Sequence, residues 1–378
     1  MRLTLSLSDN PATILVDRTI MEFRSARPVV IDGLTASALV IGVEDLDDAM
    51  SAQIGAVAGG HAHLVLSAAR LRRLGLKREV PGRVALPVVD RSRIDALALK
   101  VDQRIDALVR PADALDEEAL ELARLALVLP AAIVVPLAAG IEIDPSLLRV
   151  SGEAIRAYRG AKAADLTIVS RAPVPLDGAP ATEFVVFRGG EGLRDQVAII
   201  VGKPDLSKPV SVRLHSACLT GDLFGSLKCD CGDQLRGTVR SMAQGEGGVL
   251  LYLDQEGRGN GISNKIRAYK LQSQGYDTYD ADEVLGFEAD QRRFDFAAVM
   301  LKALGVGKVR LMTNNPEKIA ALSQAGLEVI SDHRVLGRPT AENVSYLAAK
   351  RDRTGHHIDL EGLLTRKNME GGYGVVRC

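Results

Sequence analysis

Three of the four cysteines in the sequence stand close together, at Cys218, Cys229 and Cys231. Turn-forming residues follow the first cysteine and surround the other two, so the chain can fold back and bring the thiols together. Three thiolates can hold Zn²⁺ tetrahedrally and leave one position for water, as in a catalytic zinc site. Water bound to such a zinc supplies hydroxide near neutral pH. The cluster therefore predicts hydrolysis at an electrophilic carbon.

Two other interpretations of these cysteines stay open at this stage. A structural zinc would need a fourth ligand, and the sequence offers His215 and Cys378 for it. Alternatively, the three residues are buried free thiols that hold no metal. In a reducing compartment, a cluster of this kind favours a metal over disulfides.

The elements that must position this cluster alternate between helices and strands, which is typical of α/β proteins. In the first half of the chain we expect buried strands at 28–31, 38–43 and 63–66, and a helix at 112–128. After a stretch rich in proline and glycine at 170–182, the pattern resumes. Strands are expected there at 184–187, 197–201 and 248–252, and helices at 234–242, 264–274 and 294–304. We therefore predict two α/β domains (α+β with mixed sheets), joined by a linker near 170–182.

The composition is that of an ordinary globular protein with no general affinity for polyanions. The chain has 378 residues, enough for two or three domains, with 47 Lys and Arg against 48 Asp and Glu. A net charge of −1 argues against a nucleic-acid binder or a polybasic membrane-surface protein. The N-terminus lacks the apolar run of a secretory signal, and Pro130 and Pro136 interrupt the apolar stretch 125–141. We therefore expect a cytoplasmic protein with neither membrane spans nor nucleic-acid partners.

Several motifs around the cysteines resemble the GTP cyclohydrolase II family of the riboflavin pathway. They are Arg213–Asp222, Ser226–Leu235, Gln255–Gly259, Asn264–Tyr269 and Thr313–Lys318, and the resemblance runs from about residue 174 to residue 357. Because the motifs occur in order and at compatible spacings, the resemblance is specific. It implies zinc-dependent hydrolysis of GTP to 2,5-diamino-6-ribosylamino-4(3H)-pyrimidinone 5′-phosphate, formate and pyrophosphate, the first step of riboflavin biosynthesis.

The resemblance assigns the three cysteines to the zinc and gives catalytic roles to three further residues. Tyr269 assists the opening of the guanine ring, since a phenol can donate or accept one proton. Asp290 and Arg292 act at the triphosphate, where pyrophosphate leaves. Arg292 is either the nucleophile toward the α-phosphorus or a clamp on phosphate charge. Without the neighbouring motifs, Tyr269 would be a half-buried helix tyrosine, and Asp290 and Arg292 an exposed pair at a helix start.

The same resemblance implies a set of contacts with GTP. They are Arg213, His215, Ser216, Gln234, Glu256, Gly257, Arg258, Thr278, Thr313 and Lys318. Glu256 can accept hydrogen bonds from guanine N–H groups, and Gly257 lets the backbone approach the ligand. Arg258 and Lys318 can meet phosphate oxygens, and Mg²⁺ accompanies the triphosphate. Because members of the family are dimers, the resemblance also implies a homodimer.

Three residues beside these motifs depart from the family pattern. Ala217 stands in place of a glutamate, Asp254 in place of an arginine, and Asn260 in place of an apolar residue. The charge reversal at Asp254 costs on the order of 1–3 kcal/mol of binding to a polyanion. Two alternatives follow from these departures: a GTP hydrolase with a truncated or altered product, and a catalytically impaired zinc-binding regulatory subunit.

The first part of the chain has a weaker resemblance to 3,4-dihydroxy-2-butanone 4-phosphate synthase. The acidic loop of that family falls on 31–39, where Asp32 is the single acid, and its histidine motif falls on 110–115, which lacks both the histidine and the glutamate. We therefore predict a degenerate, inactive synthase-like domain at 1–168, retained for dimer contacts or for positioning the second domain. The cyclohydrolase domain is predicted at 169–360 and a flexible tail at 361–378.

Overall fold

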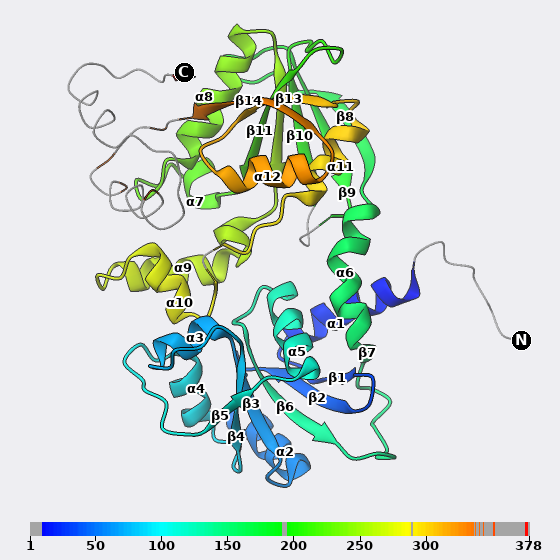
Figure 1. Cartoon of the computed structure of the whole chain (residues 1–378), viewed down its shortest axis with the longest axis vertical. Coiled ribbons are helices and arrows are strands. Elements are labelled where there is room, and N and C mark those ends of the chain that lie inside the picture. Colours follow the sequence, from blue (N-terminus) through cyan, green and yellow to red (C-terminus); the bar gives the residue numbers. More distant parts are fainter. Residues whose placement is uncertain are drawn as a thin grey trace, which may run out of the picture. The chain divides into compact units, whose positions relative to one another are not determined.

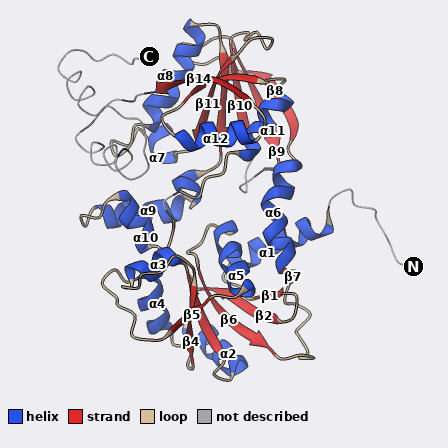
Figure 2. Cartoon of the chain, viewed as in Figure 1, coloured by secondary structure: helices blue, strands red, loops and turns tan. Residues whose placement is uncertain are grey.

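The computed structural model describes residues 10–190, 195–288 and 290–335, single residues at 337, 340, 343 and 351, and a short strand at 375–376. The described residues form two compact units, each with one mixed sheet and its helices (Figures 1 and 2). The first unit takes its residues from Met1–Ala161, Ser263–Tyr276 and Asp280–Gln291. The second takes its residues from Lys162–Ile262, Asp277–Tyr279 and Arg292–Cys378. The predicted fold class, two α/β domains with mixed sheets, is confirmed.

The first unit is built on a sheet of seven strands among the described residues, in the order β5-β4-β3-β6-β2-β1-β7. Neighbouring strands are antiparallel except β1 and β7, which run parallel. The strands are β1 (Val29–Asp32), β2 (Ser37–Gly42), β3 (Ala62–Leu66), β4 (Gly82–Leu86), β5 (Val109–Pro111), β6 (Ala131–Leu137) and β7 (Arg149–Ser151). The helices are α1 (Pro11–Arg24), α2 (Asp48–Ala58), α3 (Ala68–Arg73), α4 (Arg91–Leu99), α5 (Ala114–Leu125) and α6 (Gly152–Ala164).

Both faces of this sheet are buried, as strand β2 illustrates. Leu39 and Ile41 belong to one apolar core, and Ala38 and Val40 to the other, because successive side chains of a strand point to opposite faces. Helices α2, α3 and α4 contribute to the first core, and α1 and α5 to the second. Burial on both faces explains why this strand is a continuous apolar run in the sequence.

Two segments far along the chain complete the core that α2, α3 and α4 cover. They carry α9 (Ile262–Gln272) and α10 (Thr278–Val284). Their buried apolar side chains in that core are Ala268, Leu271, Ala281, Val284, Leu285 and Phe287. On sequence grounds both segments were expected in the domain at 169–360, but their apolar faces pack with the N-terminal sheet and its helices.

The second unit is built on a sheet of eight strands among the described residues, in the order β15-β14-β13-β11-β12-β10-β9-β8. The four central strands β14, β13, β11 and β12 run parallel, and the others pair antiparallel. The strands are β8 (Thr167–Pro173), β9 (Thr182–Arg188), β10 (Gln196–Val201), β11 (Val210–Ser216), β12 (Gly248–Leu253), β13 (Lys308–Met312), β14 (Glu328–Val335) and β15 (Val375–Val376). The helices are α7 (Leu219–Asp222), α8 (Cys231–Gln244), the 3₁₀ turn η1 (Glu256–Gly259), α11 (Asp295–Ala303) and α12 (Pro316–Gln324).

Most elements expected from the sequence are present, and the linker is the main difference. The stretch 170–182 is not an unstructured connection, because its first residues form the end of β8, which pairs with β9. β8 is an edge strand with Pro173 at its end, so proline and glycine mark a sheet edge and a turn here. The predicted tail at 361–378 lies outside the described residues apart from β15. In the part of the chain that the structure describes, no helix is long and apolar enough to cross a membrane.

Candidate active site

Three neighbouring parallel strands of the second unit end beside motif residues. Strand β11 lies between β12 and β13 and runs parallel to both. The loops that follow these strands carry Cys218, Glu256 and Thr313. Because the carboxyl ends of parallel strands meet at the same edge of a sheet, these residues share one edge, where α/β enzymes commonly bind their ligands.

The three predicted zinc ligands lie together at this edge. The Sγ atoms of Cys218, Cys229 and Cys231 lie within 4.8 Å of one another, and those of Cys218 and Cys229 are 3.6 Å apart. Cys218 directly precedes α7, and Cys231 is the first residue of α8. Gly221 permits this approach, since a Cβ atom there would lie 2.6 Å from Sγ of Cys229 and 3.0 Å from Sγ of Cys218. Three thiols at this spacing can bind one metal ion.

The crowding of the thiols changes their protonation. The Cys218 thiol and burial raise the pKa of Cys229 to about 11. The thiols of Cys218 and Cys229 raise the pKa of Cys231 well above its ordinary value. A divalent cation would let all three thiols lose their protons, because its charge offsets the mutual repulsion of the thiolates. An all-sulfur donor set suits Zn²⁺, so the residues present fit the predicted ion.

The His215 side chain interacts with the carboxylate of Asp222 and does not belong to the thiol cluster. Its Nε2 atom lies 3.1 Å from both carboxylate oxygens of Asp222, and its ring stacks on that of Tyr252 with centroids 5.6 Å apart. Burial lowers the pKa of His215, so the ring is neutral near pH 7. Among the described residues the thiol cluster contains only the three cysteines. The other candidate for a fourth ligand, Cys378, lies outside the described residues.

Asp222 organises this side of the site, although the sequence motifs indicate no role for its carboxylate. Its carboxylate accepts hydrogen bonds from the backbone N–H of Cys218 at 2.9 Å and from the hydroxyl of Tyr252 at 3.0 Å. Burial and the Asp222 carboxylate raise the pKa of Tyr252 above its usual range, so the phenol keeps the proton it donates. The signal that could have identified Asp222 is its spacing of four residues after the first cysteine, which lets the side chain reach back over one helical turn.

Arg213 and Gln234 form a hydrogen-bonded pair beside the cysteines. Nη2 of Arg213 donates to Oε1 of Gln234 at 2.5 Å, and Nη1 donates to the carbonyl of Met312 at 2.9 Å. Burial lowers the pKa of Arg213 to about 10, Cys231 acts to raise it, and Arg292 acts to lower it further. The guanidinium of Arg213 therefore stays positively charged near neutral pH. Nε of Arg213 is buried and has no hydrogen-bond partner among the described residues, so it can donate to a ligand.

The loop after β12 brings a carboxylate to the cysteine loop. Oε2 of Glu256 accepts a hydrogen bond from the backbone N–H of Leu219 at 2.6 Å. Gly257 and Arg258 both have φ of +61°, a left-handed conformation that costs glycine nothing and most other residues about 1 kcal/mol or more. The Arg258 guanidinium lies 4.1 Å from the ring centroid of Tyr279. The backbone is thus open to close approach at Gly257.

Lys318 brings a buried positive charge near His215. Nζ of Lys318 donates to the carbonyl of Leu214 at 2.6 Å, and its charge acts to lower the pKa of His215. Thr313 is also buried, and its hydroxyl accepts a hydrogen bond from the N–H of Asn315 at 3.0 Å. The predicted site residues that belong to the second unit, besides the cysteines, are Arg213, His215, Ser216, Gln234, Glu256, Gly257, Arg258, Thr278, Arg292, Thr313 and Lys318.

Two of the predicted catalytic residues belong to the first unit. Tyr269 lies on α9, where Nζ of Lys265 is 5.7 Å from the centroid of its ring. Asp290 follows α10 in the segment Asp280–Gln291. Both side chains are half-buried. Their roles in catalysis stay predictions.

The three departures from the family pattern occupy backbone positions that the sheet and the loop support. The N–H of Ala217 donates to the carbonyl of Leu253 at 2.8 Å and extends the pairing of β11 with β12. The N–H of Asp254 donates to Oε1 of Gln196 at 2.7 Å. Asn260 is buried at the end of the η1 loop. The substitutions therefore change side-chain chemistry at positions whose backbone is tied into the fold.

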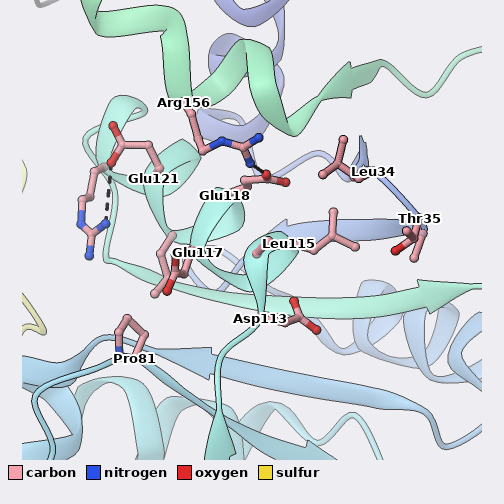
Figure 3. A pocket seen from close by; sticks show the side chains of 14 residues that line it. Leu34, Thr35, Pro81, Asp113, Leu115, Glu117, Glu118, Glu121 and Arg156 are labelled. Atoms are coloured by element: carbon pink, nitrogen blue, oxygen red, sulfur yellow. Dashed lines mark ion pairs between the residues drawn. The ribbon is translucent and has the colours of Figure 1, made fainter.

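A cavity of about 830 Å³ lies in the first unit, beside the two stretches where synthase chemistry is absent from the sequence (Figure 3). Gly33–Ala36 and Asp113–Leu115 both line it. Two of the acids that line it form ion pairs, Glu118 with Arg156 (Figure 3) and Glu121 with Arg124, whereas Glu117, which also lines it, is exposed. The Asp113 carboxylate accepts a hydrogen bond from the N–H of Asp116 at the start of α5. The cavity thus lies at the stretches that the weaker resemblance aligns with the synthase motifs.

The mixed sheet and its edge define an α/β enzyme class in which three thiols can hold a metal beside buried cationic side chains. The family model of GTP cyclohydrolase II matches residues 167–334. A GTP cyclohydrolase-2 of Xylella fastidiosa (strain 9a5c) is 43% identical over 357 residues, which cover 93% of this chain and 89% of that relative. The chain belongs to the GTP cyclohydrolase II family, and the resemblance predicted from its motifs is confirmed.

Two further similarities extend this comparison. A riboflavin biosynthesis protein RibBA of Chlorobium phaeovibrioides is 48% identical over 165 residues, which cover 44% of this chain and 40% of that protein. Among solved structures, RibBX from A. baumannii, a two-domain 3,4-dihydroxy-2-butanone 4-phosphate synthase, is 16% identical with a TM-score of 0.32. That match covers 85% of this chain and 99% of the solved one.

Proposed function

We propose that the protein hydrolyses GTP to 2,5-diamino-6-ribosylamino-4(3H)-pyrimidinone 5′-phosphate, formate and pyrophosphate, as the first step of riboflavin biosynthesis. The observation that carries this proposal is the thiol cluster of Cys218, Cys229 and Cys231 at a sheet edge that also holds the buried cations Arg213 and Lys318. A sulfur metal site suits hydrolysis at carbon, and buried cations suit a polyphosphate. Membership of the GTP cyclohydrolase II family supports the same substrate.

The guanine end of the substrate would meet the cysteine loop. The three cysteines would hold Zn²⁺, which when bound supplies Lewis acidity and an acidified water for hydrolysis at C8 of guanine. Asp222 holds the cysteine loop in place by accepting a hydrogen bond from the N–H of Cys218, and its contact with Nε2 orients His215. The Glu256 carboxylate would accept hydrogen bonds from guanine N–H groups, and Gly257 leaves room for the base. Tyr269 would donate or accept one proton as the ring opens.

The triphosphate end would meet the cationic side chains. Arg258 and Lys318 would offset phosphate charge, and Arg292 would stabilise the charge that develops as pyrophosphate leaves. Asp290 would hold the proton at this end of the site. We propose that Mg²⁺ accompanies the triphosphate, because it offsets the remaining phosphate charge. Polar contacts to the substrate would come from Ser216, Gln234, Thr278 and Thr313.

Three further properties complete the proposal. The residues at 1–168 would form a synthase-like domain without synthase activity, because Asp32, the single acid at 31–39, pairs with Arg149 and the stretch 110–115 lacks the histidine and glutamate of the synthase. The cyclohydrolase chemistry would lie within 169–360. The protein would work as a cytoplasmic homodimer.

Release of formate and pyrophosphate from GTP by purified, zinc-loaded protein with Mg²⁺ tests the proposal. We expect both products from the wild type, neither formate nor ring opening from Cys229→Ser, and loss of pyrophosphate from Arg292→Ala. Mass spectrometry of the pyrimidine product identifies how far the reaction goes. Pyrophosphate without formate would instead support the truncated reaction, for which Ala217, Asp254 and Asn260 are the motivation. Neither product despite stoichiometric zinc would support a regulatory subunit.

A further inference from the structure

The first unit holds two segments that carry proposed cyclohydrolase residues. Tyr269 lies in Ser263–Tyr276 and Asp290 in Asp280–Gln291. We propose that helix α3 positions the Asp290 segment through Arg70 and Arg72, so that the unit without synthase chemistry serves as a platform for the cyclohydrolase. This inference rests on the proposed function and names residues for which that function has no other use.

Arg70 joins the ends of two helices. It is 1% exposed, and its Nε and Nη2 donate to the carbonyls of Leu97 and Lys100 at the end of α4, each at 2.7 Å. Its Nη1 donates to the carbonyl of Val284, the last residue of α10, at 2.8 Å. The last carbonyls of a helix lack partners within the helix and carry partial negative charge. Two such ends accommodate this buried cation, although burial lowers the pKa of Arg70 to about 10.

The turn after α10 is packed against the start of α3. Ser67 caps α3 by accepting a hydrogen bond from the N–H of Arg70 at 3.2 Å. Its hydroxyl also donates to the carbonyl of Gly286 at 2.6 Å. Gly286 has φ of +84°, and a Cβ atom there would lie 3.1 Å from Oγ of Ser67. The direction in which the chain leaves α10 toward Asp290 is therefore set by α3.

Arg72 holds the segment on both sides of this turn. Its Nε donates to Oε1 of Glu283 at 2.6 Å, and its Nη2 donates to Oε2 of Glu288 at 3.0 Å. Glu288 lies two residues before Asp290 in the sequence. The buried side chains of Leu285 and Phe287 anchor the same stretch in the core of the first unit. The ion pairs thus fix the last described residues before the acid.

The segment with Tyr269 is attached by a parallel set of contacts. Nη2 of Arg267 donates to Oε2 of Glu44 at 2.7 Å, and Nδ2 of Asn264 donates to the carbonyl of Leu127 at 3.1 Å. Glu44 also accepts a hydrogen bond from the N–H of Leu129 through its other oxygen. Both segments are therefore held by buried or half-buried polar contacts in addition to apolar packing.

The test separates positioning from stability by a double-mutant cycle on the full-length, zinc-loaded protein. Arg72→Ala is expected to lower kcat for pyrophosphate release from GTP by about tenfold to a hundredfold, since misplacement by about 1 Å has such effects. In an Asp290→Asn background the same change is expected to have no further effect on the residual rate, because the group that Arg72 positions is gone. Arg72→Lys is expected to restore part of kcat. Zinc content stays at the wild-type value.

A matched control uses another arginine of the first unit. Nη2 of Arg93 donates to Oδ1 of Asp106 at 3.0 Å, and among the described residues no hydrogen bond or ion pair links either side chain to the segment Asp280–Gln291. Arg93→Ala is expected to leave kcat unchanged. The positioning role is overturned if Arg72→Ala lowers kcat by the same factor in the wild type and in the Asp290→Asn variant. It is also overturned if Arg93→Ala lowers kcat as much as Arg72→Ala does.

If the wild-type protein releases no product from GTP, a second measurement tests whether α3 holds the Asp290 segment. That result would overturn the proposed function, and hydrogen exchange would then report directly on the segment. Arg72→Ala is expected to accelerate exchange of the amides at 283–288 by about tenfold or more while the strands of the first sheet stay protected. Unchanged exchange at 283–288 would overturn the platform.

Discussion

Gly221 lies so close to Cys229 that a Cβ atom at the glycine would come within 2.6 Å of the cysteine Sγ. Contacts this short do not occur between a real Cβ and a neighbouring atom, so one of the two residues would have to move. The thiol cluster is therefore specified by a glycine as much as by its cysteines, and its geometry can be tested without removing a sulfur.

Substituting Gly221 by alanine is expected to weaken zinc binding. The methyl group would push Sγ of Cys229 and Sγ of Cys218 apart, and we expect the zinc affinity to fall by about tenfold to a hundredfold. The measurement is zinc stoichiometry and competition with a chelator. The matched control is Gly237→Ala on α8, where a Cβ atom would have nothing within 4 Å. Equal zinc affinity of both variants would contradict the expectation.

Replacing Asp254 by arginine is expected to tighten GTP binding. The half-buried carboxylate stands where the family has a cation, so its removal relieves repulsion of the triphosphate and the arginine adds attraction. We expect KM for GTP to fall by roughly tenfold at low salt, with a smaller effect at high salt because exposed charges are screened. Asp254→Asn is the control and should give a smaller decrease. An unchanged KM in both variants would mean that this charge does not face the substrate.

The stability of the zinc-free second unit is expected to fall in acid because of His215. Burial lowers the pKa of this ring below its ordinary 6.5, so below that pH the unfolded chain binds a proton that the folded chain excludes. The free energy of unfolding should therefore decrease as pH falls below about 6.5, by up to about 1.4 kcal/mol per pH unit for this residue. Urea unfolding in the presence of a chelator measures it. His215→Gln should remove this component, whereas His61→Gln at an exposed position should retain it.

The full-length protein is expected to leave ribulose 5-phosphate unchanged. Asp32, the single acid at 31–39, pairs with Arg149, and the stretch 110–115 lacks the histidine and glutamate of the synthase, whereas the proton abstractions of the synthase need free acids. Carbon-13 NMR of the substrate with Mg²⁺ follows the reaction, and formate release from GTP by the same preparation serves as the positive control. Appearance of a four-carbon phosphate would disprove the assignment of this domain as inactive.

The sequence predicts the thiol cluster and its sheet because the relevant signals are local. Cys218, Cys229 and Cys231 occur within one short stretch, and β12 is visible as a run of apolar residues. The role of Asp222 was missed because a carboxylate in a turn is common, and only the geometry identifies its donors. The linker at 170–182 was misjudged because proline and glycine mark an edge strand as readily as an unstructured connection.

The attachment of α9 and α10 could not be predicted for a different reason. The spacing of Ala268 and Leu271 indicates a buried helix face, but amphipathic spacing does not say which core the face joins. Their polar contacts link residues more than a hundred positions apart, such as Asn264 and Leu127. Distant pairings of this kind leave no periodic signal in a single sequence.

Helices α9 and α10 lie late in the chain but supply core residues of the first unit. The first unit therefore cannot finish folding until they have been synthesised. Its strands are complete once β7 has been made, yet its core still lacks Leu285 and Phe287. By the time those residues leave the ribosome, β8 to β12 of the second unit have already emerged. Folding of the first unit thus begins first and is completed late. A ribosome that stalls soon after β8 would release a chain with an uncovered apolar face, which exposes it to aggregation and quality control.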